Sequence, residues 1–227
     1  MIGFFSQYGP VWAEWQPEFI LATWVTIKLT VCSFILAVVL GMLLAIGKLS
    51  RFIVLRGFCI AYIEFVRGIP ALAILFLIYF GLVPLGLIID AFWASVIGLG
   101  MSAAGYIAEV FRAGIEAIHK GQREAAQSVG MTPAVVYRYI ILPQAIRIVL
   151  PPLLNMLIIL LKDTSICSLI STPEIMLRAK DVAMISFLPM HAFVLAAGIY
   201  FILAWPMSIL TRRLEARMRR GLRSATP

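Results

Sequence analysis

Long apolar runs alternate with short polar segments along the whole chain. Each run holds about 20 or more mainly apolar residues, the length at which an α-helix crosses the hydrocarbon core of a membrane. The fourth run is broken by prolines but stays apolar around them. The pattern predicts an all-α integral membrane protein with about five transmembrane helices, over residues 19–47, 57–82, 91–118, 144–171 and 190–211.

Composition supports this fold class. The chain has 227 residues, of which 62% are hydrophobic and only 13% are charged. Because about a quarter of the residues in soluble domains are charged, a soluble domain of this length is improbable. The net charge of +8 could indicate a nucleic-acid partner, so the placement of the basic residues decides the question.

Lysine and arginine are sorted by side of the membrane. They are absent from residues 1–27 and 83–90, follow the first and third runs, and crowd residues 212–223. Basic residues concentrate in cytoplasmic loops, so this distribution predicts an external N-terminus and an internal C-terminus. The expected partner of this charge is membrane lipid, and no nucleic-acid partner is expected.

The domain organisation follows from the same pattern. We expect residues 1–18 to form an external interfacial lead-in, in which Trp12 and Trp15 settle at the level of the lipid headgroups. Residues 19–215 form one transmembrane domain, and residues 216–227 form a basic cytoplasmic tail. We expect no cleaved leader, because the first run lacks a basic region before it and exceeds the length of a signal-peptide core.

The segment GQREAAQSVG, residues 121–130, interrupts the apolar pattern. Gly121 opens it, Gly130 is a natural left-handed stop, and Thr132-Pro133 is typical of the start of another helix. The segment is therefore a short helix bounded on both sides. A helix of about nine residues is marginal alone, so it must pack against the inner ends of this protein or against a separate cytoplasmic partner.

The fourth run carries polar residues at membrane depth. After Pro143, Pro151 and Pro152 come Asn155, Lys162, Asp163, Thr164 and Ser165. Adjacent helical residues point to different faces, so Lys162 and Asp163 do not simply neutralise each other. Buried polar groups in a membrane indicate a functional site, and a broken helix can bind a polar solute. The alternative is that this segment already lies at the external interface.

The second run is predicted to break at Gly68-Ile69-Pro70, because proline lacks the amide donor of a helix and restricts the residue before it. Just before the break, Glu64 and Arg67 stand three positions apart and so lie on one helical face. They either neutralise each other or contribute a charge to a functional site.

A further amphipathic helix is expected at about residues 173–187. Thr172 is the predicted cap, Pro173 opens the first turn, and the helix should lie along the external surface. Its apolar face is formed by Ile175, Met176, Ala179, Val182 and Ala183.

Motifs for catalysis and cofactor binding are missing from the sequence. Cys32, Cys59 and Cys167 are isolated, and the two histidines have no cysteine beside them, so we predict no metal site. The stretch from Gly98 to Ala103 formally matches a dinucleotide fingerprint but lacks the strand that this motif needs, and its small residues favour close helix packing instead. No phosphate-binding loop is present, so any energy source must be a separate protein.

The polar segment carries a known signature. Glu124-Ala125-Ala126 is followed by three residues, Gly130, nine residues, and then Ile140-x-Leu142-Pro143. In this EAA loop the chain resembles the transmembrane subunit of a bacterial ATP-binding-cassette (ABC) importer, in the polar amino-acid permease family. The likeness extends over about residues 19–215, through EFVRGIPALAILFLIYFGL, YIAEVFRAGIEAIHKGQREAAQSVGM and LLKDTSICSLIS.

The resemblance implies a transport subunit of the bacterial inner membrane that is not an enzyme. It implies that residues 121–130 are a coupling helix seated in a cleft of a cytoplasmic ATPase dimer, which binds ATP and Mg. The further implied partners are a second permease subunit, identical or homologous, and an extracytoplasmic solute-binding protein. The implied coupling residues are Glu124, Ala125, Ala126, Gly130, Leu142 and Pro143. The candidates for the substrate path are Asn155, Asp163, Thr164, Ser165, Glu64 and Glu109.

Three other functions are alternatives to an importer of a polar amino acid or close derivative. A secondary transporter or channel subunit would also use charges and broken helices in the membrane, and a purely structural subunit is a further alternative. Both leave the bounded polar helix without a partner. Motifs of a membrane enzyme, such as HExxH or GxSxG, are missing from the sequence. Acidic residues at membrane depth favour a solute with an amino group.

Overall fold

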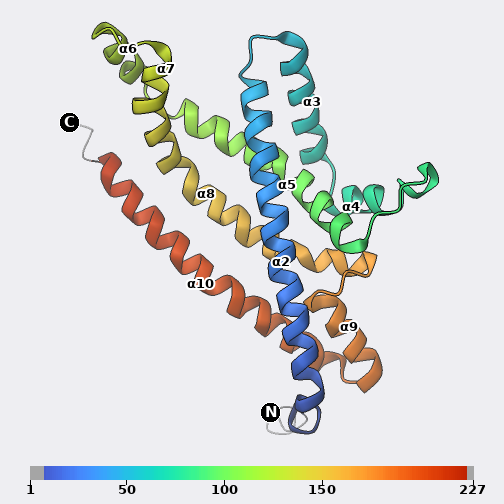
Figure 1. Cartoon of the computed structure of the whole chain (residues 1–227). Helices are drawn as coiled ribbons and strands as arrows, with labels where there is room; N and C mark the ends of the chain where they lie inside the picture. Colours follow the sequence, from blue (N-terminus) through green and yellow to red (C-terminus); the bar gives the residue numbers. More distant parts are fainter. Residues whose placement is uncertain (1–7, 224–227) are drawn as a thin grey trace.

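The computed structural model describes residues 8–223, which are built from helices and contain no strand (Figure 1). The elements run in the order α2 (Tyr8–Lys48), α3 (Ile53–Gly68), α4 (Ala71–Tyr79), η1 (Val83–Leu85), α5 (Ala91–Glu116), α6 (Lys120–Ser128), α7 (Pro133–Val136), η2 (Tyr137–Ile141), α8 (Leu142–Asp163), η3 (Thr164–Ile170), α9 (Ile175–Ser186) and α10 (Pro189–Arg223).

The candidate membrane spans confirm the predicted fold class. In the described part of the chain, four helices are long and apolar enough to cross a membrane: Val11–Lys48, Ala91–Glu116, Pro133–Ile170 and Pro189–Met218. The pair Ile53–Gly68 and Ala71–Leu85, bent by 105°, makes a fifth candidate span when it is counted as one. The bend confirms the break predicted at Gly68-Ile69-Pro70, since Ile69 and Pro70 have non-helical backbone between α3 and α4.

Helices α2 and α5 pack together as the centre of the bundle, and small residues allow their close approach (Figure 1). A Cβ atom built on Gly100 of α5 would lie 2.7 Å from the side chain of Leu36 on α2. On Gly98 it would lie 3.1 Å from the side chain of Leu75 on α4. The small residues between Gly98 and Ala103 are therefore a helix-packing motif, as predicted.

The first helix is longer than expected. Residues 8–18 continue α2 in place of a separate lead-in, and residues 1–7 lie outside the described residues. With a rise of about 1.5 Å per residue, α2 is about 60 Å long and so exceeds the thickness of the hydrocarbon layer. Trp12 is exposed, whereas Trp15 is buried against α9 and α10 instead of facing the headgroups.

Helix α9 has the predicted apolar face but a different cap. Ile175, Ala179, Val182 and Ala183 are buried with Trp15 and residues of α10. The prediction that Thr172 caps this helix is wrong. Glu174 caps it instead: its carboxylate accepts hydrogen bonds from the amides of Met176 at 2.9 Å and Leu177 at 2.7 Å.

Polar side chains around this cap form the outer cluster, made of the buried Thr26, Ser95, Thr172 and Glu174 and the half-buried Tyr200. The Thr172 and Ser95 hydroxyls lie 2.8 Å apart, and the Tyr200 hydroxyl donates to Glu174. The Ile175 amide donates to the Thr26 hydroxyl at 3.3 Å. Burial raises the pKa of the Glu174 carboxyl, although its hydrogen bonds partly offset that rise. The cluster ties α9 to α2, α5 and α10.

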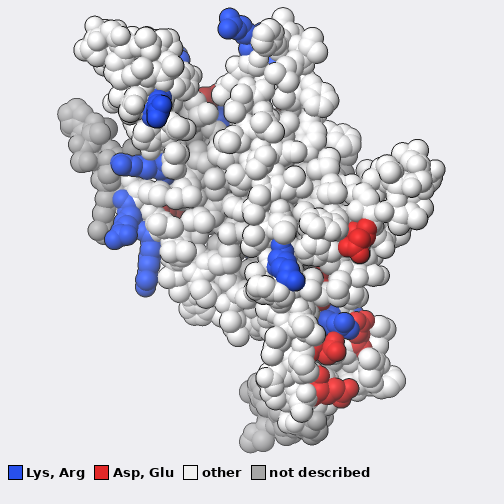
Figure 2. All heavy atoms as spheres, in the orientation of Figure 1, with Lys and Arg blue, Asp and Glu red and all other residues white. Residues whose placement is uncertain are grey.

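The two ends of the molecule differ in charge. Figure 2 shows lysine and arginine gathered at the end that carries α6 and the C-terminal part of α10, and acidic side chains gathered near α9. Arg178 is paired within this acidic region, with Glu18 at 3.2 Å and Asp181 at 3.4 Å. Because basic residues favour the cytoplasmic side, the α6 end is called the inner end below and the α9 end the outer end.

Candidate coupling segment and transmembrane pocket

The polar segment folds as the nine-residue helix α6, from Lys120 to Ser128. It is capped by His119, whose Nδ1 accepts a hydrogen bond from the Gly121 amide at 3.1 Å, so the helix begins one residue before the predicted Gly121. At its other end, Gly130 has a φ of 82°, in the left-handed region. This confirms Gly130 as the predicted stop.

The turn at Gly130 satisfies the free carbonyl groups of α6. The Met131 amide donates to the carbonyl of Ala126 at 3.1 Å, and the Gly130 amide donates to the carbonyl of Gln127 at 3.0 Å. This pair of bonds is a Schellman motif, in which the left-handed residue is usually glycine because it has no Cβ atom. The direction in which the chain leaves α6 is therefore fixed by the backbone at Gly130.

Helix α6 buries one face and exposes another. Ala126 is buried with Val136 and Ile141, next to Ile115 in the last turn of α5 and Ile118 just after that helix. Ala125 and Glu124 are exposed, and Val129 is 77% exposed. Among the described residues, none forms an ion pair or side-chain hydrogen bond with Glu124. One face thus packs on this protein's own inner end, and the opposite face is open.

The chain passes from α6 into a long helical segment that runs from the inner end towards the outer end. Helix α7 leads into the π-helical turn η2, in which the amide of Leu142 donates to the carbonyl of Tyr137. Leu142 and Pro143 then form the exposed first turn of α8. Together these elements make one continuous apolar helix from Pro133 to Ile170.

A pocket of about 400 Å³ opens where the break between α3 and α4 faces α5 and α8. Its walls are formed by Arg67 to Ala71 at the break, by Leu99, Ser102, Ala103 and Tyr106 of α5, and by Met156, Ile159, Leu160 and Asp163 of α8. The pocket therefore carries one cationic and one anionic side chain within mostly apolar walls. The guanidinium carbon of Arg67 also lies 5.6 Å from the centroid of the Tyr106 ring.

Of the six candidates for the substrate path, only Asp163 lines this pocket. Asn155 is exposed elsewhere on α8. Thr164 is buried and donates to the carbonyl of Leu161 at 2.8 Å, and Ser165 donates to the carbonyl of Lys162 at 2.8 Å. Both hydroxyls are thus bonded to the backbone of their own helical turn.

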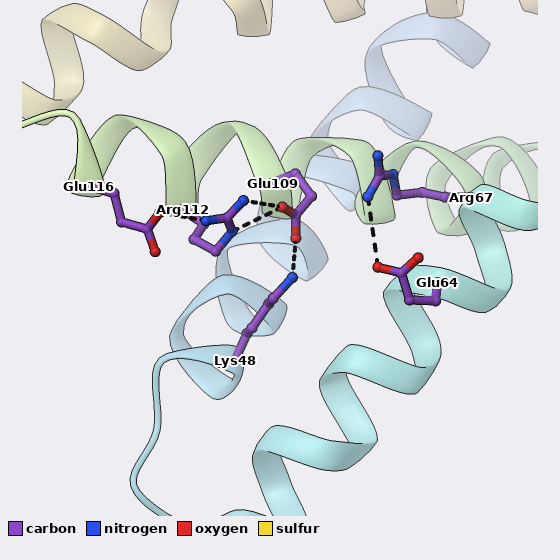
Figure 3. A network of polar contacts seen from close by, with 6 residues as sticks. All are labelled: Lys48, Glu64, Arg67, Glu109, Arg112 and Glu116. Atoms are coloured by element: carbon purple, nitrogen blue, oxygen red, sulfur yellow. Dashed lines mark hydrogen bonds and ion pairs between the residues drawn. The ribbon is translucent and has the colours of Figure 1, made fainter.

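The other two candidates, Glu64 and Glu109, face cations (Figure 3). Glu109 Oε1 lies 2.6 Å from Lys48 Nζ, and Glu109 Oε2 lies 2.7 Å from Arg112 Nη2. Arg112 also pairs with Glu116. Glu64 is exposed, and its carboxylate lies 3.9 Å from the guanidinium of Arg67. These two residues therefore pair with each other, which was one of the two alternatives predicted for them. The Lys48–Glu109 pair joins the inner end of α2 to α5 and leaves the Glu109 charge compensated.

Sequence reasoning missed several of these groups. Arg67 and Tyr106 were not expected in a pocket, and His119 was not expected as a cap. The only signal for Arg67 was its place next to the break at Gly68. Lys48 and Glu109 are far apart in the sequence, and no local pattern connects them.

Comparison with known proteins places these features in context. The profile of the family described as "Binding-protein-dependent transport system inner membrane component" matches residues 37–220. The probable amino-acid ABC transporter permease protein YckA of Bacillus subtilis (strain 168) is 37% identical over 192 residues, covering 85% of this chain and 85% of that protein. The probable glutamine ABC transporter permease protein GlnM of the same organism is 39% identical over 183 residues, covering 81% and 85%.

Solved structures agree with the sequence relatives. The crystal structure of an amino acid ABC transporter with histidines superimposes with a TM-score of 0.87 at 37% identity, covering 90% of this chain and 96% of that one. An inward-facing structure of the MetNI methionine ABC transporter gives a TM-score of 0.70 at 21% identity, covering 89% and 97%. The second likeness concerns the fold alone.

Proposed function

On the premise that the chain belongs to the family of binding-protein-dependent transport inner membrane components, we propose that α6 couples it to an ATPase and that the Asp163 pocket receives its solute. The chain is the multi-pass permease subunit of an amino-acid ABC importer of the inner membrane, and it is not itself the ATPase. This confirms the resemblance carried by the EAA loop and decides against a secondary transporter or channel.

Membership of the family indicates which classes of partner protein the chain works with. A binding-protein-dependent ABC importer works with a separate ATPase, in which ATP binds, and with a solute-binding protein. We propose in addition that the ATPase is a dimer that binds ATP with Mg, and that a second permease subunit, identical or homologous, completes the importer. The permease domain comprises residues 19–215 in this proposal, and residues 216–227 are its basic cytoplasmic tail.

The coupling role of α6 rests on one observation above all. This helix is held on one face by its own protein at Ala126 and is open on the other face at Ala125. Because Ala125 carries only a methyl group, a partner could approach the helix backbone closely there. The turn at Gly130 fixes the angle between α6 and α7, and so a push on α6 is delivered in a defined direction.

The pocket supports a zwitterionic solute. Arg67 and Asp163 line the same space with opposite charges, which suit the carboxylate and the ammonium group of an amino acid. The relatives named for glutamine and arginine transport support a polar amino acid or a close derivative as the solute class. Of the six candidates for the substrate path, this proposal gives a direct solute contact to Asp163 alone, because the other five, Asn155, Thr164, Ser165, Glu64 and Glu109, lie outside the walls of the pocket.

In this proposal the assembled importer has an inward-facing and an outward-facing conformation, which bind nucleotide with different affinity. ATP binding closes the ATPase pair and draws the two copies of α6 together, which turns the helices outward to receive solute from the binding protein. Hydrolysis restores the inward-facing state. Nucleotide drives the change because it binds one conformation more tightly than the other.

Replacing Gly130 tests the coupling proposal. Isoleucine at this left-handed position costs about 1–3 kcal/mol of backbone strain and redirects the turn. The G130I variant should insert normally, lose uptake about tenfold or more, and co-purify with less ATPase. The matched control is G57I: Gly57 is in α3, and a Cβ atom built on it meets nothing within 4 Å. Normal uptake by G130I would reject the coupling role of this segment.

A further inference from the structure

A side-chain contact bridges α6 to the start of the long helix that leads to the pocket. Nη2 of Arg123 donates to the Tyr137 hydroxyl at 2.9 Å. The guanidinium carbon of Arg123 also lies 5.1 Å from the centroid of the Tyr137 ring. Among the described residues, this is the one side-chain hydrogen bond that joins α6 to η2 or α8.

Tyr137 occupies a special position in the backbone. It is the first residue of the π-helical turn η2, and its carbonyl accepts the bond from the Leu142 amide that closes the turn. A π-turn holds one more residue than an α-turn, and such turns inside helices are frequently functional. Because the two kinds of turn hold different numbers of residues, a change of η2 to α-geometry would rotate α8 relative to α6 and α7.

The surroundings of η2 leave room for such a shift. Tyr137 and Leu142 border an apolar space of about 730 Å³ between the inner ends of α2, α5 and α8. Ala45 and Ile46 of α2 and Phe111 of α5 form part of the far wall. Protein interiors are usually packed too tightly for a turn to change register without displacing its neighbours. Tyr137 and Leu142 are exposed, so this space is a groove open at the surface, and on that side η2 is not enclosed by the rest of the described chain.

We propose that Arg123 and Tyr137 are positioning residues that tie η2 to α6, so that the displacement of α6 by the ATPase is delivered to α8. The tie holds the first residue of the π-turn, and the same continuous helix carries Asp163 to the pocket. The hydrophobic contacts of Ala126 with Val136 and Ile141 hold the same elements together but are not directional. The directional hydrogen bond fixes their relative position. This inference rests on the coupling role proposed above for α6.

A double-mutant cycle tests the tie in the complete importer with its ATPase and solute-binding protein. The variants are R123A, Y137A and the double variant, and the readout is the number of solute molecules moved per ATP hydrolysed. Each single variant should lower this ratio about threefold or more. The double variant should be no worse than the more severe single variant, because residues that act as a pair are non-additive. ATPase co-purification should stay unchanged.

The matched controls are R138A and Y139A. Arg138 stands over the ring of Tyr139 at 5.6 Å, but both residues belong to η2 and therefore join no two elements. Their variants should keep the normal ratio of solute to ATP. The milder variants R123K and Y137F should each lower the ratio less than the alanine variants, and they keep the test valid if an alanine variant folds poorly.

Three results would overturn the tie. The first is an unchanged ratio in both single variants. The second is additive losses in the double variant, which would show that the residues act separately. The third is loss of ATPase co-purification in R123A alone, which would assign Arg123 to the ATPase interface. Failure of the tie differs from failure of the coupling proposal, because the latter is decided by uptake and association of G130I.

Discussion

Two polar regions at opposite ends of this membrane protein use their polar residues in opposite ways. At the inner end, α6 exposes Glu124 and Ala125 and depends on a few small apolar contacts through Ala126. At the outer end, Glu174 is fully buried, and its carboxylate is satisfied by two backbone amides and the Tyr200 hydroxyl.

The difference shows what each region contributes. A buried carboxylate whose hydrogen bonds are satisfied stabilises one arrangement of helices, and removing it leaves donors unpaired. An exposed polar helix contributes little to stability and instead presents a surface to a partner. Polar residues in an apolar sequence can therefore either stabilise the fold or bind a partner. Buried polar residues do the first, and exposed ones do the second.

The largest effect is expected in the outer cluster. The E174L variant removes the cap of α9 and leaves the Met176 and Leu177 amides and the Tyr200 hydroxyl without their acceptor. The summed loss is about 3 kcal/mol, from a lost cap and unpaired buried donors. Thermal unfolding in detergent should show a much lower midpoint.

The control for E174L is another carboxylate cap. Asp90 is exposed and accepts a hydrogen bond from the Phe92 amide at 2.9 Å at the start of α5. The D90A variant should cost only about 1 kcal/mol. Equal midpoints for E174L and D90A would contradict the stabilising role of the outer cluster.

Asp163 lies between the two extremes, since it is partly buried but faces a pocket. The D163N variant keeps the shape of the side chain and removes its charge. We expect uptake of the solute to fall about tenfold or more, as expected when a charged hydrogen bond worth about 1.5 kcal/mol is lost, while ATPase co-purification is unchanged. Uptake assays with radiolabelled amino acids measure this effect.

The matched control for D163N is N155A, since Asn155 is on the same helix but outside the pocket walls. This variant should transport normally. If D163N keeps the wild-type rate and solute preference, Asp163 is not part of the solute site.

Local patterns in the sequence predicted much of this architecture. Apolar run lengths located the spans, and the properties of glycine and proline located the break at Pro70 and the turn at Gly130. These features depend on residues close in sequence. The EAA spacing located α6 through its resemblance to a family.

Contacts between distant segments could not be predicted in this way. Lys48 and Glu109 meet only because α2 and α5 cross at a particular angle, and Arg67 reaches the pocket only because α3 and α4 bend by 105°. Glu174 displaced the predicted cap Thr172 because the hydroxyl of Thr172 is taken by Ser95 of α5 and the carbonyl of Ala91. Tertiary hydrogen bonds therefore overrode a valid local signal.

The central claim is that the open face of α6 contacts the ATPase. Short-range crosslinking from a cysteine placed on that face tests this contact most directly. The A125C variant is made in a protein whose Cys32, Cys59 and Cys167 are replaced by serine or alanine. With a short reagent that joins a cysteine thiol to a lysine amine, it should crosslink to the ATPase in membranes with a yield that depends on ATP. The buried control A126C should crosslink far less, because Ala126 faces Val136 and Ile141. No crosslink from A125C in an assembled, transporting importer would contradict the account.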